Sequence, residues 1–283
     1  MIGKTRHSRE KARVEEIFDP GVGRARGVLR GPPSAGHFTH IRRNPPSDLA
    51  PWIDHYWMVN WELSQPYLQE TLPHPNIYLL FENAKSVIAG VHTAKFSRVL
   101  EGESGVFGVK FKPGGFRPFM KASVATLLNQ TVPARRIFGK DADALERSLS
   151  ASSWEAEKMI DATNTFFRAR APGPDLKIEL SDRIVGLILQ DREIKTANGL
   201  VERTQIDKRK LQRLFHEYVG IHPKWVIRRY RLHELIEILN RGDEPDWAQT
   251  ALALGYFDQA HLINDFKSIV GYPPEKYQSH SNR

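Results

Sequence analysis

A stretch near the C-terminus repeats an earlier stretch at a fixed offset of 51 residues, and this duplication limits the possible folds more than any other feature. The earlier copy reads "QIDKRKLQRLFHEYVGIHPKW" from Gln205, and the later copy reads "YFDQAHLINDFKSIVGYPPEKY" from Tyr256. Six pairs are identical at this offset: Asp207 and Asp258, Leu211 and Leu262, Phe215 and Phe266, Val219 and Val270, Gly220 and Gly271, and Pro223 and Pro274. Such repetition predicts one structural unit that the chain uses twice.

Both copies carry signals for the start and the end of a helix. Each opens with Asp, whose carboxylate accepts hydrogen bonds from the free amides of a first helical turn. Each closes with Gly, which ends a helix readily, and Pro follows three residues later. Leu and Phe four residues apart, with Val four residues further, form one apolar stripe that must pack inward. The pattern predicts a helix from Asp207 to Gly220 and another from Asp258 to Gly271.

A shorter helical stretch and a tight turn precede each predicted helix. The first stretch is "TANGLVE" and the second is "DWAQTALAL", and Ala197 and Ala248 match at the same offset. This is the helix-turn-helix order, in which the second helix enters the major groove of DNA. The first turn departs from the second because Thr204 stands where the second copy has Gly255, so we expect the two turns to differ in geometry.

The outward positions of both helices carry side chains that suit base edges. Arg pairs with guanine, Gln or Asn with adenine, and Ala or Ile touches the thymine methyl group. A solvated helix face is the plain alternative for basic residues, but the duplicated and capped context favours DNA contact. The predicted DNA-binding residues are Lys208, Arg209, Lys210, Gln212 and Arg213 in the first copy, and Gln259, Ala260, His261, Asn264 and Lys267 in the second.

The C-terminal module, from about residue 176 to residue 280, resembles the AraC/XylS family of transcriptional regulators. The resemblance rests on "KRKLQRLFHEYVGIHPKWVI", "RYRLHELIEIL" and "LGYFDQAHLINDFKSIVGYPPEKY". It implies two helix-turn-helix units joined by a long helix, here from Pro223 to about Asn240. It also implies base-reading sites at Arg209, Gln212 and Arg213 and at Gln259, Ala260, His261 and Asn264, with double-stranded DNA and RNA polymerase as partners.

Two recognition helices in successive major grooves lie about 34 Å apart, which is one turn of DNA. Because the outward residues of the two copies differ, we expect a binding site with two different halves. A shorter separation would require bent DNA. Asn264 stands where the family often has a longer cation, so we expect the first helix to dominate affinity.

The region before the module mixes short strands with helices. "DHYWMVNWEL", "NIYLLFE", "KSVIAGV" and "SGVFGVKFK" are β-branched and aromatic, whereas "GFRPFMKASVATLLNQ" and "SSWEAEKMIDATNTFFRARA" predict helices. The region resembles an uncharacterised cupin-like sensor domain, which implies a small β-barrel or sheet with packed helices that takes an effector or forms a homodimer. Its motifs do not name the effector.

The expected fold class is therefore α+β with an all-α C-terminal module. We predict a flexible basic tail over residues 1–36, a cupin-like domain over 37–171, and a DNA-binding domain over 172–283, with "RAPGPD" as the linker. The formal net charge is +8, and residues 1–43 hold 10 Lys and Arg against 4 acidic residues. This tail is either a non-specific DNA arm or dispensable.

Composition excludes several classes of site. The chain has no cysteine, which excludes disulfides, thiolate zinc sites and a cysteine nucleophile. No apolar run approaches the roughly 20 residues of a membrane span, so we expect a cytoplasmic protein without a membrane partner. No metal or other cofactor is expected because no His-x-His pair with a following Glu is present. The histidines considered are His37, His40, His55, His74 and His92.

Three other polar residues, Glu82, Arg228 and Arg229, have two interpretations each, and Arg231 has one. Glu82 either orients an effector or is a solvated acid at the end of a strand. For Arg228 and Arg229, a contact with DNA phosphates and the absence of such a contact are both open. Arg231 is expected to pair with an acid between the two units.

We interpret the chain as a sequence-specific transcription regulator and not as an enzyme, with activation and repression both open. We expect an effector or a change of subunit contact to reposition the module through residues 154–175. One rival is a cupin-type enzyme with a regulatory DNA-binding module. The other is a non-specific architectural DNA-binding protein.

Overall fold

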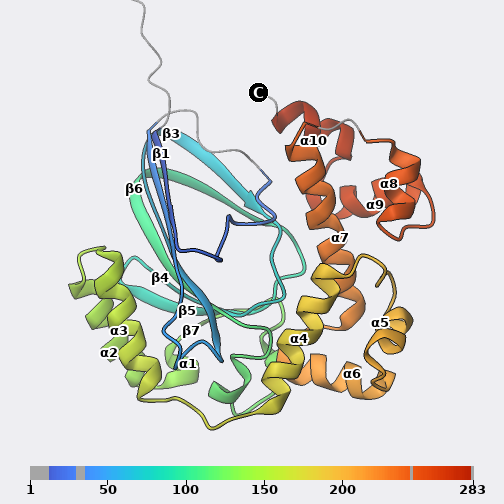
Figure 1. Cartoon of the computed structure of the whole chain (residues 1–283). Coiled ribbons are helices and arrows are strands. Elements are labelled where there is room, and N and C mark those ends of the chain that lie inside the picture. Colours follow the sequence, from blue (N-terminus) through green and yellow to red (C-terminus); the bar gives the residue numbers. More distant parts are fainter. Residues whose placement is uncertain (1–12, 30–35, 243–244, 282–283) are drawn as a thin grey trace, which may run out of the picture.

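The computed structural model describes residues 13–29, 36–242 and 245–281. The first half of the chain forms a curved β-sheet with helices packed on it, and the second half forms helices that lie beside the sheet (Figure 1). This agrees with the α+β class predicted from the sequence. The loop of residues 169–175 lies between the two parts, where the sequence predicted a linker.

The sheet has seven strands in the order β1-β2-β3-β6-β4-β5-β7. Only β1 pairs in parallel, with β2, among the strand pairs of the described residues. The order places β1 and β7 at opposite edges. The sequence predicted a small barrel or a sheet, and the structure has an open sheet. The strands are β1 Arg13–Phe18, β2 His37–Arg43, β3 Ile53–Thr71, β4 Tyr78–Glu82, β5 Lys85–Ala89, β6 Phe96–Phe111 and β7 Thr131–Pro133.

One face of the sheet is apolar because side chains alternate along each strand. Tyr56 and Met58 of β3 and Phe107 and Val109 of β6 are buried in the same core as residues of the helices α2 and α3. The Tyr56 hydroxyl donates to the Asn164 side chain of α3 at 2.6 Å, which ties sheet to helix. The helices of this half are α1 Arg135–Phe138, α2 Asp141–Ala151 and α3 Ala156–Arg168.

One predicted helix is wrong. The stretch "GFRPFMKASVATLLNQ" forms only two short 3₁₀ turns, η1 Arg117–Phe119 and η2 Val124–Leu127. Pro118 cannot continue a helix that began before it, and Asn129 has a positive φ of 56°. The stretch nevertheless buries Phe116, Val124 and Leu127 in the core.

The predicted flexible tail of residues 1–36 is also wrong over residues 13–29. The strand β1 pairs with β2 from Arg13 to Phe18, and Leu29 is buried with 1% of its surface exposed. The isolated bridge between Val28 and Thr71 holds the segment to β3. The prediction failed because it was based on the Gly-rich composition of the segment, whereas a few apolar residues are enough to dock it. Residues 1–12 and 30–35 lie outside the described residues.

The second half contains the helices predicted from the duplication. The long helix α7 connects two groups of shorter helices, with α5 and α6 near one of its ends and α8 and α9 near the other (Figure 1). The helices are α4 Leu176–Gln190, α5 Ala197–Thr204, α6 Lys208–Leu214, a π-helical turn Phe215–Val219, α7 Pro223–Asn240, α8 Trp247–Ala253, α9 Gln259–Val270 and α10 Pro274–Ser281.

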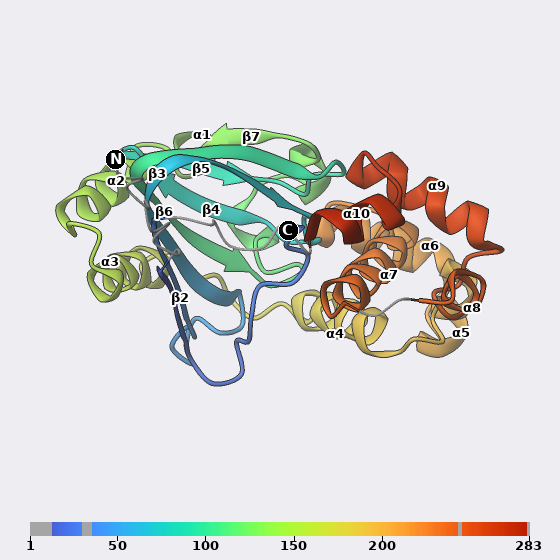
Figure 2. The same cartoon turned by 90° about the horizontal axis from the view of Figure 1, so that it is seen from above.

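Two hydrophobic clusters connect the halves. The larger cluster runs from the sheet through α4 and α6 into the first half of α7. The second surrounds the rest of α7 with α8, α9 and α10, and it includes Leu29 and Leu72 from the N-terminal half. Both helix-turn-helix units therefore pack against the N-terminal half (Figure 2).

Candidate nucleic-acid interface

The caps predicted for the two duplicated helices are present. The Asp207 carboxylate accepts from the amides of Arg209 at 2.9 Å and Lys210 at 3.2 Å at the start of α6. The Asp258 carboxylate accepts from the His261 amide at 2.7 Å at the start of α9. Each capping bond satisfies an amide that has no partner within the helix, so these helix starts are set by the sequence itself.

The ends of the two helices match the prediction as well. Gly220 has a φ of 88° and Gly271 has a φ of 99°, a conformation that L side chains rarely adopt. The first helix closes with a π-helical turn, in which the Gly220 amide donates to the Phe215 carbonyl at 2.7 Å. The apolar stripe packs inward as predicted, and its buried members are Leu211, Phe215, Val219, Leu262, Phe266 and Val270.

All ten predicted DNA-binding residues are exposed. On α6, Arg209, Lys210 and Arg213 have no carboxylate within ion-pair distance among the described parts of the chain, and Lys208 reaches only the Asn198 side chain, at 3.5 Å. Free cations on a solvent-facing helix are available to an anionic partner. The exposed residues are Lys208, Arg209, Lys210, Gln212 and Arg213 on α6, and Gln259, Ala260, His261, Asn264 and Lys267 on α9.

The turns of the two units differ, as the substitution of Thr204 for Gly255 predicted. In the second unit Gly255 takes the left-handed conformation with a φ of 79°. In the first unit the left-handed residue is Gln205, with a φ of 55°, one position later in the alignment. A side chain in this conformation costs roughly 1 to 2 kcal/mol. The first unit thus makes its turn at an energetic cost that Gly avoids.

The long helix α7 carries three arginines with different contacts. Arg231 is buried, pairs with Glu234 at 3.3 Å, and donates to the carbonyls of Asp191 and Ile194. The expected pairing of Arg231 with an acid is confirmed. It holds the loop before α5 against α7.

Arg228 and Arg229 face different neighbours. Arg228 pairs with Asp265 of α9, and half of its side chain is exposed. Arg229 is only 1% exposed, donates to the Thr93 carbonyl, and lies over the Trp225 ring at 4.5 Å. Burial lowers the pKa of Arg229 to about 10. A phosphate contact by Arg229 is excluded in this arrangement because the guanidinium is covered.

Comparison with known protein families matched residues 200–280 to a family described as a helix-turn-helix domain. The C-terminal region is an AraC-type helix-turn-helix domain. Such a domain binds DNA, and the chain is accordingly a DNA-binding transcription regulator. Residues 41–133 matched a domain of unknown function (DUF6597).

Solved structures of ToxT from Vibrio cholerae are similar to the chain. An apo ToxT variant from strain SCE256 is 12% identical with a TM-score of 0.39, and the match covers 84% of this chain and 100% of that one. Wild-type ToxT from the same strain, bound to an unsaturated fatty acid, is 12% identical with a TM-score of 0.37, covering 89% and 98%. A search of curated proteins found no match. In the described residues, no helix is both long and apolar enough to cross a membrane.

The AraC-type domain makes direct contacts with the N-terminal half that the sequence did not predict. Lys95 of the loop before β6 donates to the Val270 carbonyl at the end of α9, at 2.8 Å, and pairs with Glu70. Arg26 pairs with Glu237 of α7. The Lys95–Val270 and Arg26–Glu237 contacts each join residues more than a hundred positions apart that carry no local pattern, so sequence periodicity offers no signal for them.

The first unit has its own contacts with the N-terminal half. The Ser123 hydroxyl donates to the His216 carbonyl at 2.7 Å, and Lys112 pairs with Asp182 of α4 at 3.2 Å. A Cβ on Gly220 would come within 2.9 Å of Val124. Together with those of the second unit, these contacts join the halves at several loops, and the bond from the Tyr218 hydroxyl to the Asp175 carboxylate, at 2.6 Å, adds one within residues 154–175.

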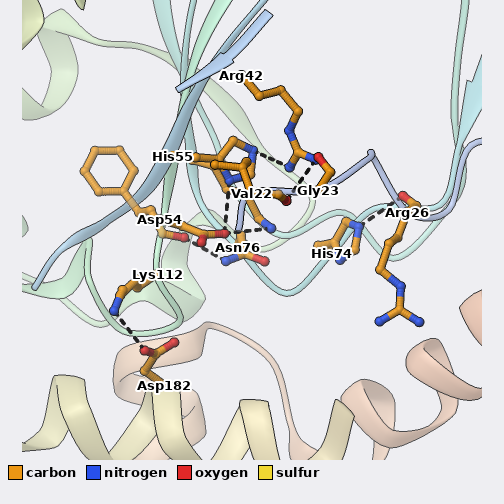
Figure 3. A network of polar contacts seen from close by, with 12 residues as sticks. Val22, Gly23, Arg26, Arg42, Asp54, His55, His74, Asn76, Lys112 and Asp182 are labelled. Atoms are coloured by element: carbon orange, nitrogen blue, oxygen red, sulfur yellow. Dashed lines mark hydrogen bonds and ion pairs between the residues drawn. The ribbon is translucent and has the colours of Figure 1, made fainter. Parts of the chain in front are cut away.

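A buried polar network occupies the other face of the sheet (Figure 3). Arg42 of β2 lies 2.7 Å from the His55 ring of β3, and it donates to the carbonyl oxygens of Val22 and Gly23. Asp54 pairs with Lys110 of β6 at 2.9 Å. Burial lowers the pKa of His55 to about 4, although Asp54 acts in the opposite direction. The segment before Leu29 therefore covers a polar face of the sheet.

Glu82, His74 and His92 have ordinary partners. Glu82 forms a bidentate ion pair with Arg98, in which the Arg98 Nη1 atom lies 2.6 Å from Glu82 Oε2. Glu82 is therefore not a free acid. His92 lies near the Thr131 hydroxyl and His74 near the Arg26 carbonyl, both at 3.2 Å. Within residues 13–29, 36–242 and 245–281, no group of three or more His, Asp and Glu side chains could hold a metal ion.

Proposed function

We propose that the chain regulates transcription by reading two different half-sites of one DNA segment, with α6 in one major groove and α9 in the next. The main observation in support is that α6 and α9 each have a buried apolar stripe and an exposed face. That face holds all ten residues whose chemistry suits bases and phosphates. The single helix α7 spans the distance between the two units and supports a constant separation.

The two helices carry different chemistry. The helix α6 presents Lys208, Arg209, Lys210 and Arg213, whereas α9 presents Lys267 near its end. Most of the phosphate attraction therefore belongs to α6. The helix α9, with Gln259, His261 and Asn264, contributes hydrogen bonds that depend on the bases it meets. Because the two helices expose different residues, the proposed DNA site has two unlike halves.

An effector bound by the N-terminal half modulates DNA reading in this proposal. Support comes from the contacts of that half with both units, through Lys95 and Arg26 on one and through Ser123 and Lys112 on the other. An effector acts only by binding two arrangements of the halves with different affinity. Contact with RNA polymerase and pairing of two copies through the N-terminal half belong to the same proposal.

Binding-site selection from random double-stranded DNA tests the proposal, run with the wild type and the Arg213→Ala variant. The wild type is expected to enrich an asymmetric motif of about 20 base pairs, two turns of DNA. Arg213→Ala is expected to lose about 1 to 3 kcal/mol and to relax the preference at one base of one half. An unchanged motif would show that Arg213 reads no base.

The same experiment separates the rivals. Binding without an enriched motif would support a non-specific architectural protein. A stoichiometric metal ion in the purified protein, measured by elemental analysis, would support the enzyme alternative. An exposed arginine outside the units, such as Arg147, supplies the control because Arg147→Ala removes one charge without touching α6 or α9.

A further inference from the structure

A carboxylate is buried on the second recognition helix at the point where α9 crosses α7. Asp265 is 4% exposed, and it accepts a hydrogen bond from the Tyr256 hydroxyl at 2.7 Å. Arg228 of α7 donates to both carboxylate oxygens, with its Nε atom 3.3 Å from Oδ2. These three residues join α9 to the turn before it and to the long helix.

The contacts extend to a predicted base-reading residue. The Tyr256 ring meets the His261 ring edge-on, with centroids 5.2 Å apart and planes at 88°. His261 is exposed and lies in the first turn of α9, on the side predicted to face DNA. One tyrosine thus contacts both the buried carboxylate and the exposed imidazole. Because the His261 ring packs against the Tyr256 ring, a shift of the Tyr256 ring changes the position that His261 takes.

The first unit has no equivalent of this arrangement. At the offset of 51 residues, Leu214 stands for Asp265 and Gln205 stands for Tyr256. Leu214 is 8% exposed and belongs to the large hydrophobic cluster. The helix α6 is therefore positioned by apolar packing, whereas the same place in the second unit depends on directional hydrogen bonds and an ion pair.

The polar contacts of Asp265 lie at the solvent-open margin of the second unit. A groove of about 210 Å³, open to solvent, lies beside Asp265 between α7 and α9, lined by Trp225, Arg228, Arg229 and Ser268 among others. This part of the interface is open to solvent, and half of the Arg228 side chain is exposed there. Apolar packing of Leu262, Phe266 and Val270 holds α9 in the second cluster, and the Arg228, Asp265 and Tyr256 contacts add directional bonds at this crossing.

We propose that Arg228, Asp265 and Tyr256 are positioning residues that set the base preference of the second recognition helix, with Tyr256 acting through His261. The inference deepens the proposed function and rests on it. The three side chains orient the helix that reads the second half-site. The first half-site does not depend on them because α6 has Leu214 at the matching place.

The Tyr256→Phe variant tests the proposal because it removes one hydroxyl and keeps the ring in the core. Tyr218→Phe is the matched control in the first unit, where the Tyr218 hydroxyl donates to the Asp175 carboxylate at 2.6 Å. Selection on random DNA is run with both variants, and binding is measured to sites altered in one half only. Circular dichroism and melting temperature check that both variants are folded.

Tyr256→Phe is expected to flatten the base preference of one half-site by about fivefold to tenfold and to leave the other half unchanged, since a single base contact is worth about that factor. The flattened half is expected to be the one weakened by His261→Ala. In the His261→Ala background, Tyr256→Phe is expected to add no further loss of preference. Asp265→Asn is expected to flatten the same half while Tyr218→Phe flattens neither.

Additive losses in the Tyr256→Phe and His261→Ala double variant would overturn the action of Tyr256 through His261. An unchanged motif in folded Tyr256→Phe and Asp265→Asn would overturn the positioning role altogether. Equal flattening of both halves would show a general loss of structure and would likewise overturn it. If the wild type itself enriched no motif, the proposed function would fail, which the wild-type arm shows separately.

Discussion

Replacing Lys95 with Met should loosen the second helix-turn-helix unit from the N-terminal half. The Lys95 ammonium donates to the Val270 carbonyl at the C-terminal end of α9, where a helix carries partial negative charge, and it pairs with Glu70. Its side chain is 25% exposed and that of Glu70 is 4% exposed, so solvent screens the pair only in part. Met keeps the length and apolar stem of the side chain.

The magnitude follows from the bonds lost. A hydrogen bond to a charged group contributes about 1.5 to 3 kcal/mol. We take about 2 kcal/mol for the partly exposed ammonium. Because each 1.4 kcal/mol is a factor of ten, the equilibrium ratio of the docked to the released second unit then falls about thirtyfold. The helices α9 and α10 then open locally more often while the sheet keeps its own stability.

Hydrogen exchange followed by mass spectrometry measures this effect. Peptides that cover Gln259–Val270 and Pro274–Ser281 should exchange about thirtyfold faster in Lys95→Met than in the wild type, while peptides of β3 and β6 stay unchanged. The control is Lys121→Met, which removes an exposed lysine outside this contact. Equal exchange of α9 in Lys95→Met and in the wild type would refute the reasoning that Lys95 holds the second unit.

Two further predictions concern acid and salt. Burial lowers the pKa of His233 to about 3, well below its ordinary 6.5, so the unfolded chain binds the proton first and stability falls as pH drops below 6.5. At pH 5.5 this group alone should cost about 1.4 kcal/mol relative to pH 7.5, and urea unfolding of His233→Leu should show a pH loss smaller by that amount. An equal pH loss in both proteins would exclude His233 as a source. Lys267→Ala should weaken binding to all DNA sequences alike and reduce the slope of log K against log salt by about 1. Fluorescence anisotropy titrations at several salt concentrations measure this slope, and a loss confined to one sequence would contradict a phosphate contact.

Much of the DNA-binding half could be predicted from the sequence because its signals are local. The caps at Asp207 and Asp258 and the ends at Gly220 and Gly271 act within one helical turn, so their spacing in the sequence is their spacing in space. The duplicated stripe could likewise be assigned to the buried side without knowledge of its partner. The ten predicted DNA-binding residues are exposed for the same reason, although their contact with DNA stays a prediction.

The N-terminal half was harder to predict, and the errors have identifiable causes. Apolar residues between Phe116 and Leu127 suggested a helix and are buried in the large cluster, but Pro118 interrupts the backbone pattern and only two short 3₁₀ turns form. The Gly-rich composition before Leu29 suggested a tail, but a few side chains dock on distant surfaces. Composition averages over such residues, whereas packing depends on them individually.

The sequence by itself determined two capped helices with a buried stripe, an exposed set of donors on each, and a long helix between them. Only the tertiary structure decided what holds each unit in place. Leu214 packs in an apolar core while Asp265, at the matching position, bonds to Tyr256 and Arg228. Lys95 reaches the end of α9 from a loop 175 residues earlier in the chain. Capping and periodicity act between neighbours along the chain, but these contacts depend on the path of the whole chain, which no local pattern records.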